Sequence, residues 1–252
     1  MKAVILCGGF GTRFSEKTKT IPKPMIKIGR FPILFHIMKI YENNGINEFV
    51  LALGYRGKII EKFFNYPNLK KLNIQYYKHL GKKPKELKWK ITFNYSGLKT
   101  MTGGRLLRLK KLLKDEENFL LTYGDGLANV NVKKLIKFHK RHKKIGSVTA
   151  VIPNARFGAL NIKDNNKVTS FSEKPQSGEG WINGGFFCFN NKIFKYLKND
   201  TTVLEEGPLE NLARNKNLFA FKHFRYWQCM DTRRDFDILY NQWKRKKVLW
   251  LK

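Results

Sequence analysis

The first half of the chain alternates short apolar runs with amphipathic segments. Residues 3–6 and 48–53 are apolar runs of strand length. In residues 32–44 the apolar side chains recur at helical spacing, a proline opens the segment and a glycine follows it. Residues 58–64 are amphipathic in the same way. The pattern therefore predicts strand, helix, strand and helix in that order.

The alternation continues to about residue 152. It predicts a strand at 73–77, a helix at 105–113, a strand at 119–123, a helix at 132–144 and a strand at 147–152. Strands separated by helices are typical of a largely parallel sheet with helices on both faces. We expect an α/β protein with a Rossmann-like, largely parallel mixed sheet.

From residue 159 the pattern changes to short strands, in 159–174 and 181–189, with a turn at 164–166. Helices return at 204–214 and 233–246, where Thr232 and Asp235 have the spacing of a capping box. We interpret 1–252 as one domain. Its core is about 1–150, followed over 151–252 by a small added β-rich portion and C-terminal helices.

A glycine-rich loop follows the first predicted strand. Gly8, Gly9 and Gly11 lie between residues 3–6 and Arg13, at the strand end where open α/β sheets bind ligands. Glycines allow backbone N–H groups to approach an anion, and an arginine can hold two phosphate oxygens. The spacing is neither a Walker loop nor a strict dinucleotide motif. The glycines alone support a phosphate cradle and a plain turn equally.

Composition adds a net charge of +31. Such a charge attracts polyanions, whether nucleic acid, an anionic membrane or a phosphorylated small molecule, and does not choose among them. Lysine is spread along the whole chain with much Asn, Ile and Phe, a mixture that AT-rich coding also produces. No segment is long and apolar enough to span a membrane, and the N-terminus has no room for a signal peptide. We expect a soluble cytoplasmic protein.

The cysteines are Cys7, Cys188 and Cys229. Their odd number and wide spacing suggest neither a disulfide framework nor a zinc site. Burial as small hydrophobic side chains is the default interpretation.

Residues 8–25, GGFGTRFSEKTKTIPKPM, resemble the signature of the sugar-1-phosphate nucleotidyltransferases. The resemblance covers essentially the whole chain and narrows to the cytidylyl branch of that family. The motifs that carry it are ALGYRG (52–57), MTGGRL (101–106), LTYGDG (121–126), RFGAL (156–160), FSEKP (171–175), WINGGFF (181–187) and YWQCMDT (226–232). It implies transfer of the cytidylyl group of CTP to glucose 1-phosphate, which gives CDP-glucose and pyrophosphate. The product would serve deoxysugar and surface polysaccharide (O-antigen, lipopolysaccharide) synthesis.

The resemblance also implies a Mg²⁺ site at Asp125 and Asp231. Two carboxylates can hold Mg²⁺ and leave positions open for phosphate oxygens. A turn aspartate and a charge at a helix N-terminus are the alternative interpretations of these two residues.

The other implied site residues bind the substrates. Arg13 and Lys23 match positions that hold the triphosphate, Lys174 the position that holds the sugar phosphate, and Asn183 with Gly184 the sugar-binding segment. Thr100 and Arg105 fall where the family contacts CTP. The nucleotide-binding set is completed by Leu6, Gly8, Gly9, Gly11, Thr12 and Gly124. Surface solvation is the alternative for the basic residues, and a bulge in an ordinary strand for Gly184 and Gly185.

Some features receive a simpler interpretation. Trp181 and Trp227 could stack on a ligand, but core packing is more typical. His139 and His142 share a predicted helix among many lysines, where a solvated face is favoured over a metal site. The same basic run has no aromatic interleaving, so we expect no nucleic-acid partner. The family implies a homo-oligomer.

The chain departs from the family pattern at three positions. Ile21 replaces the first lysine of Lys-Pro-Lys-Pro, Cys7 replaces an alanine of the loop, and Cys229 replaces a proline before Met-Asp. Loss of a basic side chain at position 21 would weaken CTP binding.

Two rival functions remain open from the sequence. One is a nucleotidyltransferase that uses another nucleotide or sugar phosphate, such as UTP. The other is a non-catalytic basic module that binds nucleotide or RNA on the same fold. Retention of Arg13, Lys23, Asp125, Lys174 and Asp231 argues against the second.

Overall fold

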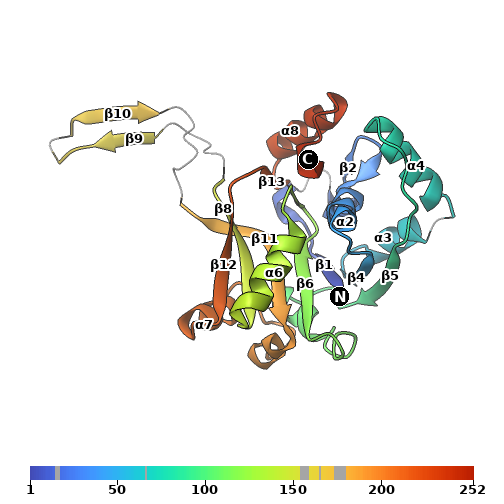
Figure 1. Ribbon diagram of the computed structural model, residues 1–252, viewed down its shortest axis with the longest axis horizontal. Coiled ribbons are helices and arrows are strands. Elements are labelled where there is room, and N and C mark those ends of the chain that lie inside the picture. The colour runs from blue at the N-terminus through green and yellow to red at the C-terminus, as the bar shows by residue number, and fades with distance from the viewer. Residues whose placement is uncertain (15–17, 66, 154–158, 165, 173–179) are drawn as a thin grey trace.

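A seven-stranded sheet forms the centre of the protein (Figure 1). The computed structural model describes residues 1–14, 18–65, 67–153, 159–164, 166–172 and 180–252. The strand order is β12-β8-β11-β6-β1-β4-β5, and β11 runs antiparallel to both of its neighbours while the other neighbouring pairs are parallel. The bounds are β1 (Ala3–Cys7), β4 (Glu48–Leu53), β5 (Lys90–Tyr95), β6 (Asn118–Tyr123), β8 (Gly146–Val151), β11 (Ile182–Asn190) and β12 (Leu218–His223). The predicted α/β class with a largely parallel mixed sheet is confirmed.

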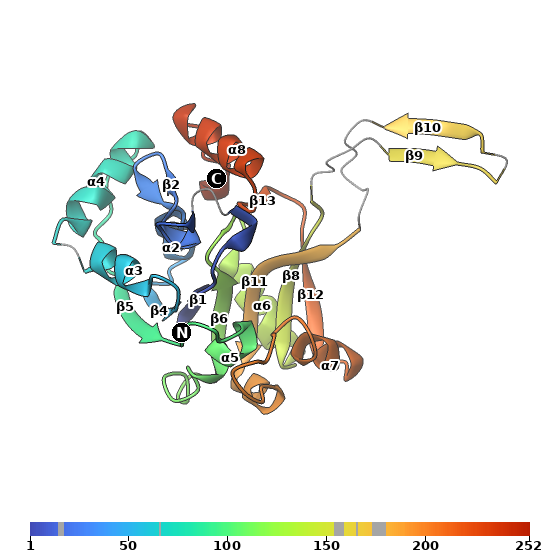
Figure 2. The ribbon, with the colours of Figure 1, turned by 180° about the vertical axis from the view of Figure 1, so that it is seen from behind.

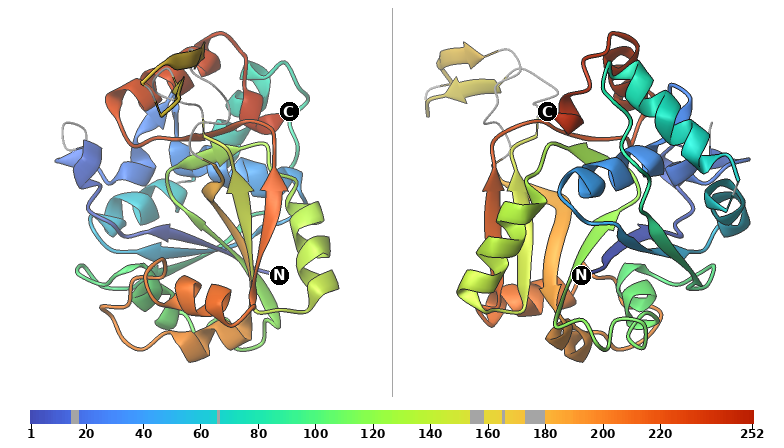
Figure 3. Two further views of the ribbon diagram at one scale, coloured as in Figure 1. Left: turned by 90° about the vertical axis from the view of Figure 1, so that its left-hand side faces the viewer. Right: turned by 45° about the vertical axis from the view of Figure 1, so that its right-hand side comes forward.

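Helices cover both faces of this sheet. They are α2 (Ile33–Asn43), α3 (Gly57–Phe64), α4 (Leu69–His79), α5 (Thr102–Leu107), α6 (Val132–His142), α7 (Pro208–Arg214) and α8 (Arg233–Lys244), with short 3₁₀ turns η1 (Thr12–Phe14), η2 (Lys23–Met25), η3 (Asn191–Tyr196) and η4 (Leu249–Leu251). The helix α6 packs on the face opposite to α7 and η3 (Figure 3). None of the helices in the described ranges is long and apolar enough to cross a membrane.

One predicted strand is wrong. Residues 73–77 lie inside α4, and the strand next to β4 is β5, which the sequence pattern did not predict. The apolar positions 69, 72, 76 and 80 recur at helical spacing, and Tyr76 packs edge-to-face on Phe31. The short aromatic run was therefore part of a longer helical pattern that polar residues obscured.

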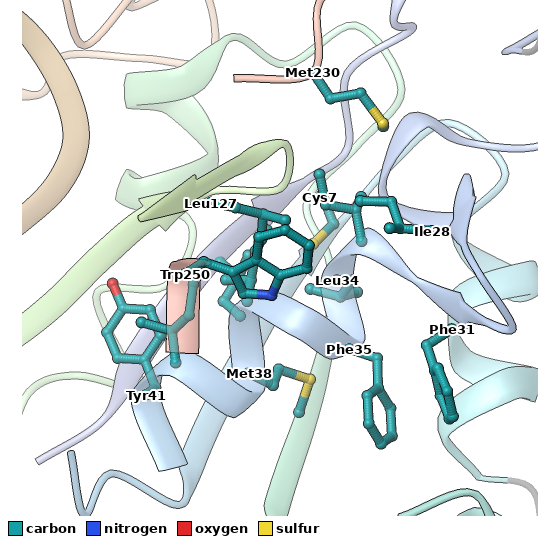
Figure 4. Packing of buried hydrophobic residues seen from close by; sticks show 14 of the residues in the cluster. Cys7, Ile28, Phe31, Leu34, Phe35, Met38, Tyr41, Leu127, Met230 and Trp250 are labelled. Atoms are coloured by element: carbon teal, nitrogen blue, oxygen red, sulfur yellow. The ribbon is translucent and has the colours of Figure 1, made fainter. Parts of the chain in front are cut away.

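Two separate cores follow from strand alternation. Along β1, Ala3, Ile5 and Cys7 face one core while Val4 and Leu6 face the other. The first core packs α2 and the C-terminal segment against the sheet around Trp250, as Figure 4 shows. The second packs α5, η3 and α7 against the opposite face. Each large apolar side chain so buried stabilises the fold by about 1.5–3 kcal/mol.

The β-rich stretch does not form a unit of its own. Strands β11 and β12 lie within the main sheet, and only the antiparallel pair β9 (Ala159–Ile162) and β10 (Val168–Ser172) stands away from the body (Figures 1 and 2). Two further pairs are short: β13 (Trp227–Cys229) with β7 (Gly126–Ala128), and β2 (Lys27–Ile28) with β3 (Phe31–Pro32).

The fold makes stability depend on pH through His36. Its Nε2 lies 3.1 Å from the carbonyl oxygen of Ile28 and its Nδ1 lies 2.9 Å from the Tyr76 hydroxyl. A neutral ring satisfies both contacts by donating from Nε2 and accepting at Nδ1. Burial lowers the pKa of His36 to about 3.

We expect the free energy of unfolding to decrease as the pH is lowered from about 6.5 to about 3. Over that range the histidine becomes protonated in the unfolded chain but stays neutral in the folded protein. The slope contributed is about 1.4 kcal/mol per pH unit at its steepest, and the stabilisation is fully present above pH about 6.5. Urea unfolding of the wild type and of His36→Gln across this range measures it. Equal slopes in the two proteins would contradict the assignment.

Candidate active site

Three loops meet at one edge of the sheet because β1, β4 and β6 run parallel. The glycine loop follows β1, residues 54–56 follow β4, and Gly124 and Asp125 follow β6. The carbonyl oxygen of Gly8 accepts the N–H of Tyr55 at 3.1 Å. The carboxyl ends of parallel strands thus form one shared surface, as expected for a ligand site in an open α/β sheet.

Arg105 fixes the shape of this edge. Its buried guanidinium donates to the carbonyl oxygens of Gly8 (2.9 Å), Gly97 (2.7 Å) and Leu53 (3.2 Å), and to the Ser96 hydroxyl (2.9 Å). A planar cation with several donors suits this task. Arg105, which the sequence predicts to contact CTP, therefore directs its N–H groups mainly at backbone oxygens of three loops. Thr100, the other predicted CTP contact in this segment, is also buried.

The glycine loop itself is open to a ligand. Gly9 and Thr12 are exposed, and Gly11 adopts a left-handed φ of 67° that turns the chain into η1. Leu6 and Gly124 lie buried behind the loop, where a Cβ on Gly124 would lie 2.8 Å from the Pro24 ring and 3.1 Å from the Leu6 carbonyl oxygen. The Arg13 side chain lies outside the described part of the structure, although its backbone belongs to η1.

Two carboxylates meet beside this loop. Strand β13 pairs antiparallel with β7, so that Cys229 stands opposite Gly126 and the N–H of Met230 donates to the Asp125 carbonyl at 2.9 Å. This register brings Asp231, which is 106 positions further along the chain, to Asp125.

The loop that carries Asp231 is held by the capping box of α8. The carboxylate of Asp235 accepts the N–H groups of Asp231 (3.1 Å) and Thr232 (2.8 Å), and the Thr232 hydroxyl accepts the N–H of Asp235. The predicted capping role of Thr232 and Asp235 is confirmed. Asp231 thus precedes a fixed helix terminus.

Lys23 lies between the two carboxylates. Its Nζ donates to Asp125 Oδ2 at 2.7 Å and to Asp231 Oδ1 at 2.5 Å. The side chain leaves η2 between Pro22 and Pro24, which limit its backbone freedom. Burial alone would lower the pKa of this lysine, but the carboxylates of Asp125 and Asp231 outweigh burial and raise its pKa above the ordinary value. The ammonium is therefore a fixed positive charge.

The same place suits a metal ion. Donor atoms of Asp125, Asp231 and Cys229 all lie within 4.8 Å of one another, and the Lys23 ammonium already occupies the position of a cation. Carboxylate oxygens are ligands that hard divalent cations prefer. The donor set fits the divalent metal that the sequence predicts for Asp125 and Asp231. The prediction of Cys229 as a buried hydrophobic side chain is wrong, whereas Cys7 and Cys188 are buried as expected.

A second group of polar side chains continues the site along β11. Asn183 Nδ2 donates to the Tyr123 hydroxyl at 3.4 Å, and its Oδ1 accepts the N–H of Gly185 at 2.8 Å. Trp227 Nε1 donates to the Gly184 carbonyl at 2.8 Å, so this indole supports the glycine pair. The register of β11 with β8 shifts between residues 183 and 187, which agrees with the alternative interpretation of Gly184 and Gly185 as an irregularity in a strand.

Glu205 completes this group and was missed from the sequence. Its carboxylate accepts hydrogen bonds from the Tyr123 hydroxyl and from Thr102 Oγ1, the latter at 2.6 Å. It thereby links β6 to the start of α5. The only signal in the sequence was an acidic residue in a chain with 19 acidic and 50 basic residues.

Three further residues singled out from the sequence have different outcomes. Lys174 falls outside the described residues. His139 is not on a solvated face: it is buried and bonded to Ser147 Oγ (2.9 Å) and Asn118 Oδ1 (3.0 Å). Trp181 is 40% exposed and packs on Phe224 rather than in a core.

The contact between Gly8 and Arg105 leaves no room for a side chain. A Cβ on Gly8 would lie 2.1 Å from Arg105 Nη1. At Gly9 there is space for a Cβ, since none of the described residues beyond its chain neighbours would come within 4 Å of it. We expect Gly8→Ala to lower the free energy of unfolding by about 2 kcal/mol, because a displaced guanidinium leaves buried carbonyls unpaired. The matched control, Gly9→Ala, should change it by less than about 0.5 kcal/mol. Urea titrations measure both, and equal losses would contradict the role of Arg105.

Comparisons with known proteins show the family to which the chain belongs. The nucleotidyl transferase family matches residues 2–233. A glucose-1-phosphate cytidylyltransferase of Salmonella typhimurium is 44% identical, with 99% of this chain and 98% of that protein covered. A probable glucose-1-phosphate cytidylyltransferase of Bacillus subtilis is 43% identical, with 99% of each covered. HddC from Yersinia pseudotuberculosis, solved in complex with GMP-PN, shares the fold with a TM-score of 0.70, 24% identity and coverage of 96% of this chain and 98% of that chain. The chain therefore belongs to the nucleotidyl transferase family and is a nucleotidyltransferase.

Proposed function

We propose that this enzyme transfers the cytidylyl group of CTP to glucose 1-phosphate and releases pyrophosphate, which gives CDP-glucose. The observation that carries the proposal is the full-length similarity, at 44% and 43% identity, to proteins named for this reaction. The cluster of Lys23, Asp125 and Asp231 beside an open glycine loop supplies charges that such a transfer needs.

The chemistry needs alignment more than a base. The phosphate of glucose 1-phosphate has a second pKa of about 6 and is mostly dianionic at neutral pH. One of its oxygens attacks the α-phosphorus of CTP, the bond to the β-phosphate oxygen breaks, and pyrophosphate leaves with the electron pair. The enzyme therefore has to hold both phosphates in line and to neutralise charge on the leaving group.

The glycine loop and two basic residues would bind the triphosphate. Exposed Gly9 and Thr12 offer backbone groups to phosphate oxygens, and Arg13 follows them in η1. Lys23 reaches the same edge of the sheet and would stabilise charge on the leaving pyrophosphate. Arg105 acts through Gly8, whose carbonyl it holds, so it positions the loop.

Asp125 and Asp231 would hold the divalent metal ion that this family uses, which we propose to be Mg²⁺. When bound, the ion would neutralise phosphate charge and orient the triphosphate. Lys23 would then exchange its two carboxylates for phosphate oxygens of the nucleotide.

Asn183 would bind the sugar. Its position at the start of β11 places the amide beside Tyr123, whose hydroxyl is held by Glu205. An amide can donate to and accept from sugar hydroxyls, and Gly184 leaves space for a ring. By its match to the family motif, Lys174 would hold the phosphate of glucose 1-phosphate.

The role of the carboxylates can be tested by isosteric substitution. We expect Asp125→Asn and Asp231→Asn each to lower kcat by about 100-fold or more, because each removes a charge that binds the cation. Pyrophosphate release gives the rate and circular dichroism verifies folding. Asp237→Asn is the matched control, since this exposed carboxylate pairs with Arg233 on α8. Near-normal rates in either site variant would exclude the metal role.

The substrate assignment can be tested with a nucleotide panel. We expect pyrophosphate release with glucose 1-phosphate, Mg²⁺ and CTP, and at least about tenfold lower kcat/KM with UTP, dTTP, ATP or GTP, equivalent to about 1.4 kcal/mol of discrimination. Preference for another nucleotide would support the nucleotidyl transfer reaction but would contradict the assignment of CTP as the substrate. Release with none of them, together with salt-dependent RNA binding, would favour the non-catalytic module.

A further inference from the structure

Cys229 is the one cysteine in the described part of the chain that is not buried in a core. It lies at the end of β13 (Trp227–Cys229), opposite Gly126 of β7.

The sulfur shares its position with both carboxylates. One donor atom each from Cys229, Asp125 and Asp231 lies within 4.8 Å of the others, which is a spacing that one ion can span. All three residues are half-buried and so reachable from the open edge of the sheet. Lys23 Nζ, at 2.7 Å and 2.5 Å from the two carboxylates, shows that a cation is accommodated at this point.

Sulfur changes which metals such a site prefers. Mg²⁺ takes oxygen ligands almost exclusively and gains little from a thiol. Zn²⁺ and Cd²⁺ bind thiolate strongly, and three protein ligands with one open position are typical of catalytic zinc sites. Two carboxylates and one sulfur therefore form a donor set for a thiophilic cation.

We propose that Cys229, together with Asp125 and Asp231, forms a binding site for thiophilic divalent cations of the zinc class, in competition with the hard metal of the transfer reaction. Binding forms a metal–sulfur bond, releases the thiol proton to solvent and displaces the Lys23 ammonium from the carboxylates; no electron is transferred. The proposal uses the carboxylates of the proposed function, but binding is measured without substrates. Its failure and a failure of the proposed reaction are therefore distinguishable.

The test is a Cd²⁺ titration of the purified full-length chain without nucleotide. Binding through sulfur produces a sulfur-to-cadmium charge-transfer absorption in the near ultraviolet. We expect this absorption to saturate at one Cd²⁺ per chain in the wild type and to be lost in Cys229→Ser. Cys188→Ser is the matched control and should retain it, because Cys188 lies on β11 with its side chain buried in the first core. Loss in Cys188→Ser with retention in Cys229→Ser would overturn the proposal.

Two further variants show whether the carboxylates belong to the same site. Asp231→Asn should weaken Cd²⁺ binding by about 10-fold or more, as expected for loss of one charged ligand. Lys23→Met should strengthen it by about 10-fold, because the resident ammonium no longer competes. Unchanged affinity in both variants would place the cadmium away from these residues and would overturn the proposal.

The competition with the hard metal gives an independent readout. Excess Mg²⁺ should shift the Cd²⁺ titration of the wild type to higher cadmium concentration, since both ions need the same carboxylates. If added Mg²⁺ does not shift the Cd²⁺ titration, the two ions bind at separate sites, and the proposal is also overturned.

Discussion

The site depends on a charge constraint: two carboxylates from distant parts of the chain are held together and need a cation between them. Like charges at a half-buried position repel each other strongly unless an opposite charge is present. Lys23 supplies that charge in the structure, at 2.7 Å and 2.5 Å from the two carboxylates. The same electrostatic demand makes the position suitable for a divalent ion. A lysine ammonium and a divalent ion can each meet this requirement.

The scaffold that maintains this constraint is mostly polar backbone held by a few buried side chains. Arg105 fixes three loops through their carbonyl oxygens, and Asp235 fixes the loop before α8 through its N–H groups. Neither residue has to touch a ligand to determine where ligands bind. Positioning of this kind is needed because productive geometry tolerates errors of only about an ångström.

The net charge of +31 acts at a different scale. A diffuse excess of lysine attracts anionic substrates and raises association rates. Dissolved salt screens this attraction over a distance of about 10 Å at ordinary ionic strength. The attraction cannot select a nucleotide or a sugar. Selection depends on the few side chains at the sheet edge, which explains why the composition left nucleic acid, membrane and small phosphates equally open.

The sequence by itself determined the α/β class, most of the strands and helices and the capping box of α8, because periodicity and short motifs are local properties. It also singled out Lys23, Asp125 and Asp231 as candidate site residues, whose side chains the structure brings together. It misplaced residues 73–77, missed the edge strand β5 and took Cys229 for a core residue. Only the tertiary structure decided that Cys229 faces two carboxylates, that Arg105 binds loop carbonyls and that Glu205 holds Tyr123. The physical reason is strand register: the pairing of β13 with β7 brings together residues about 100 positions apart, and no local pattern encodes it.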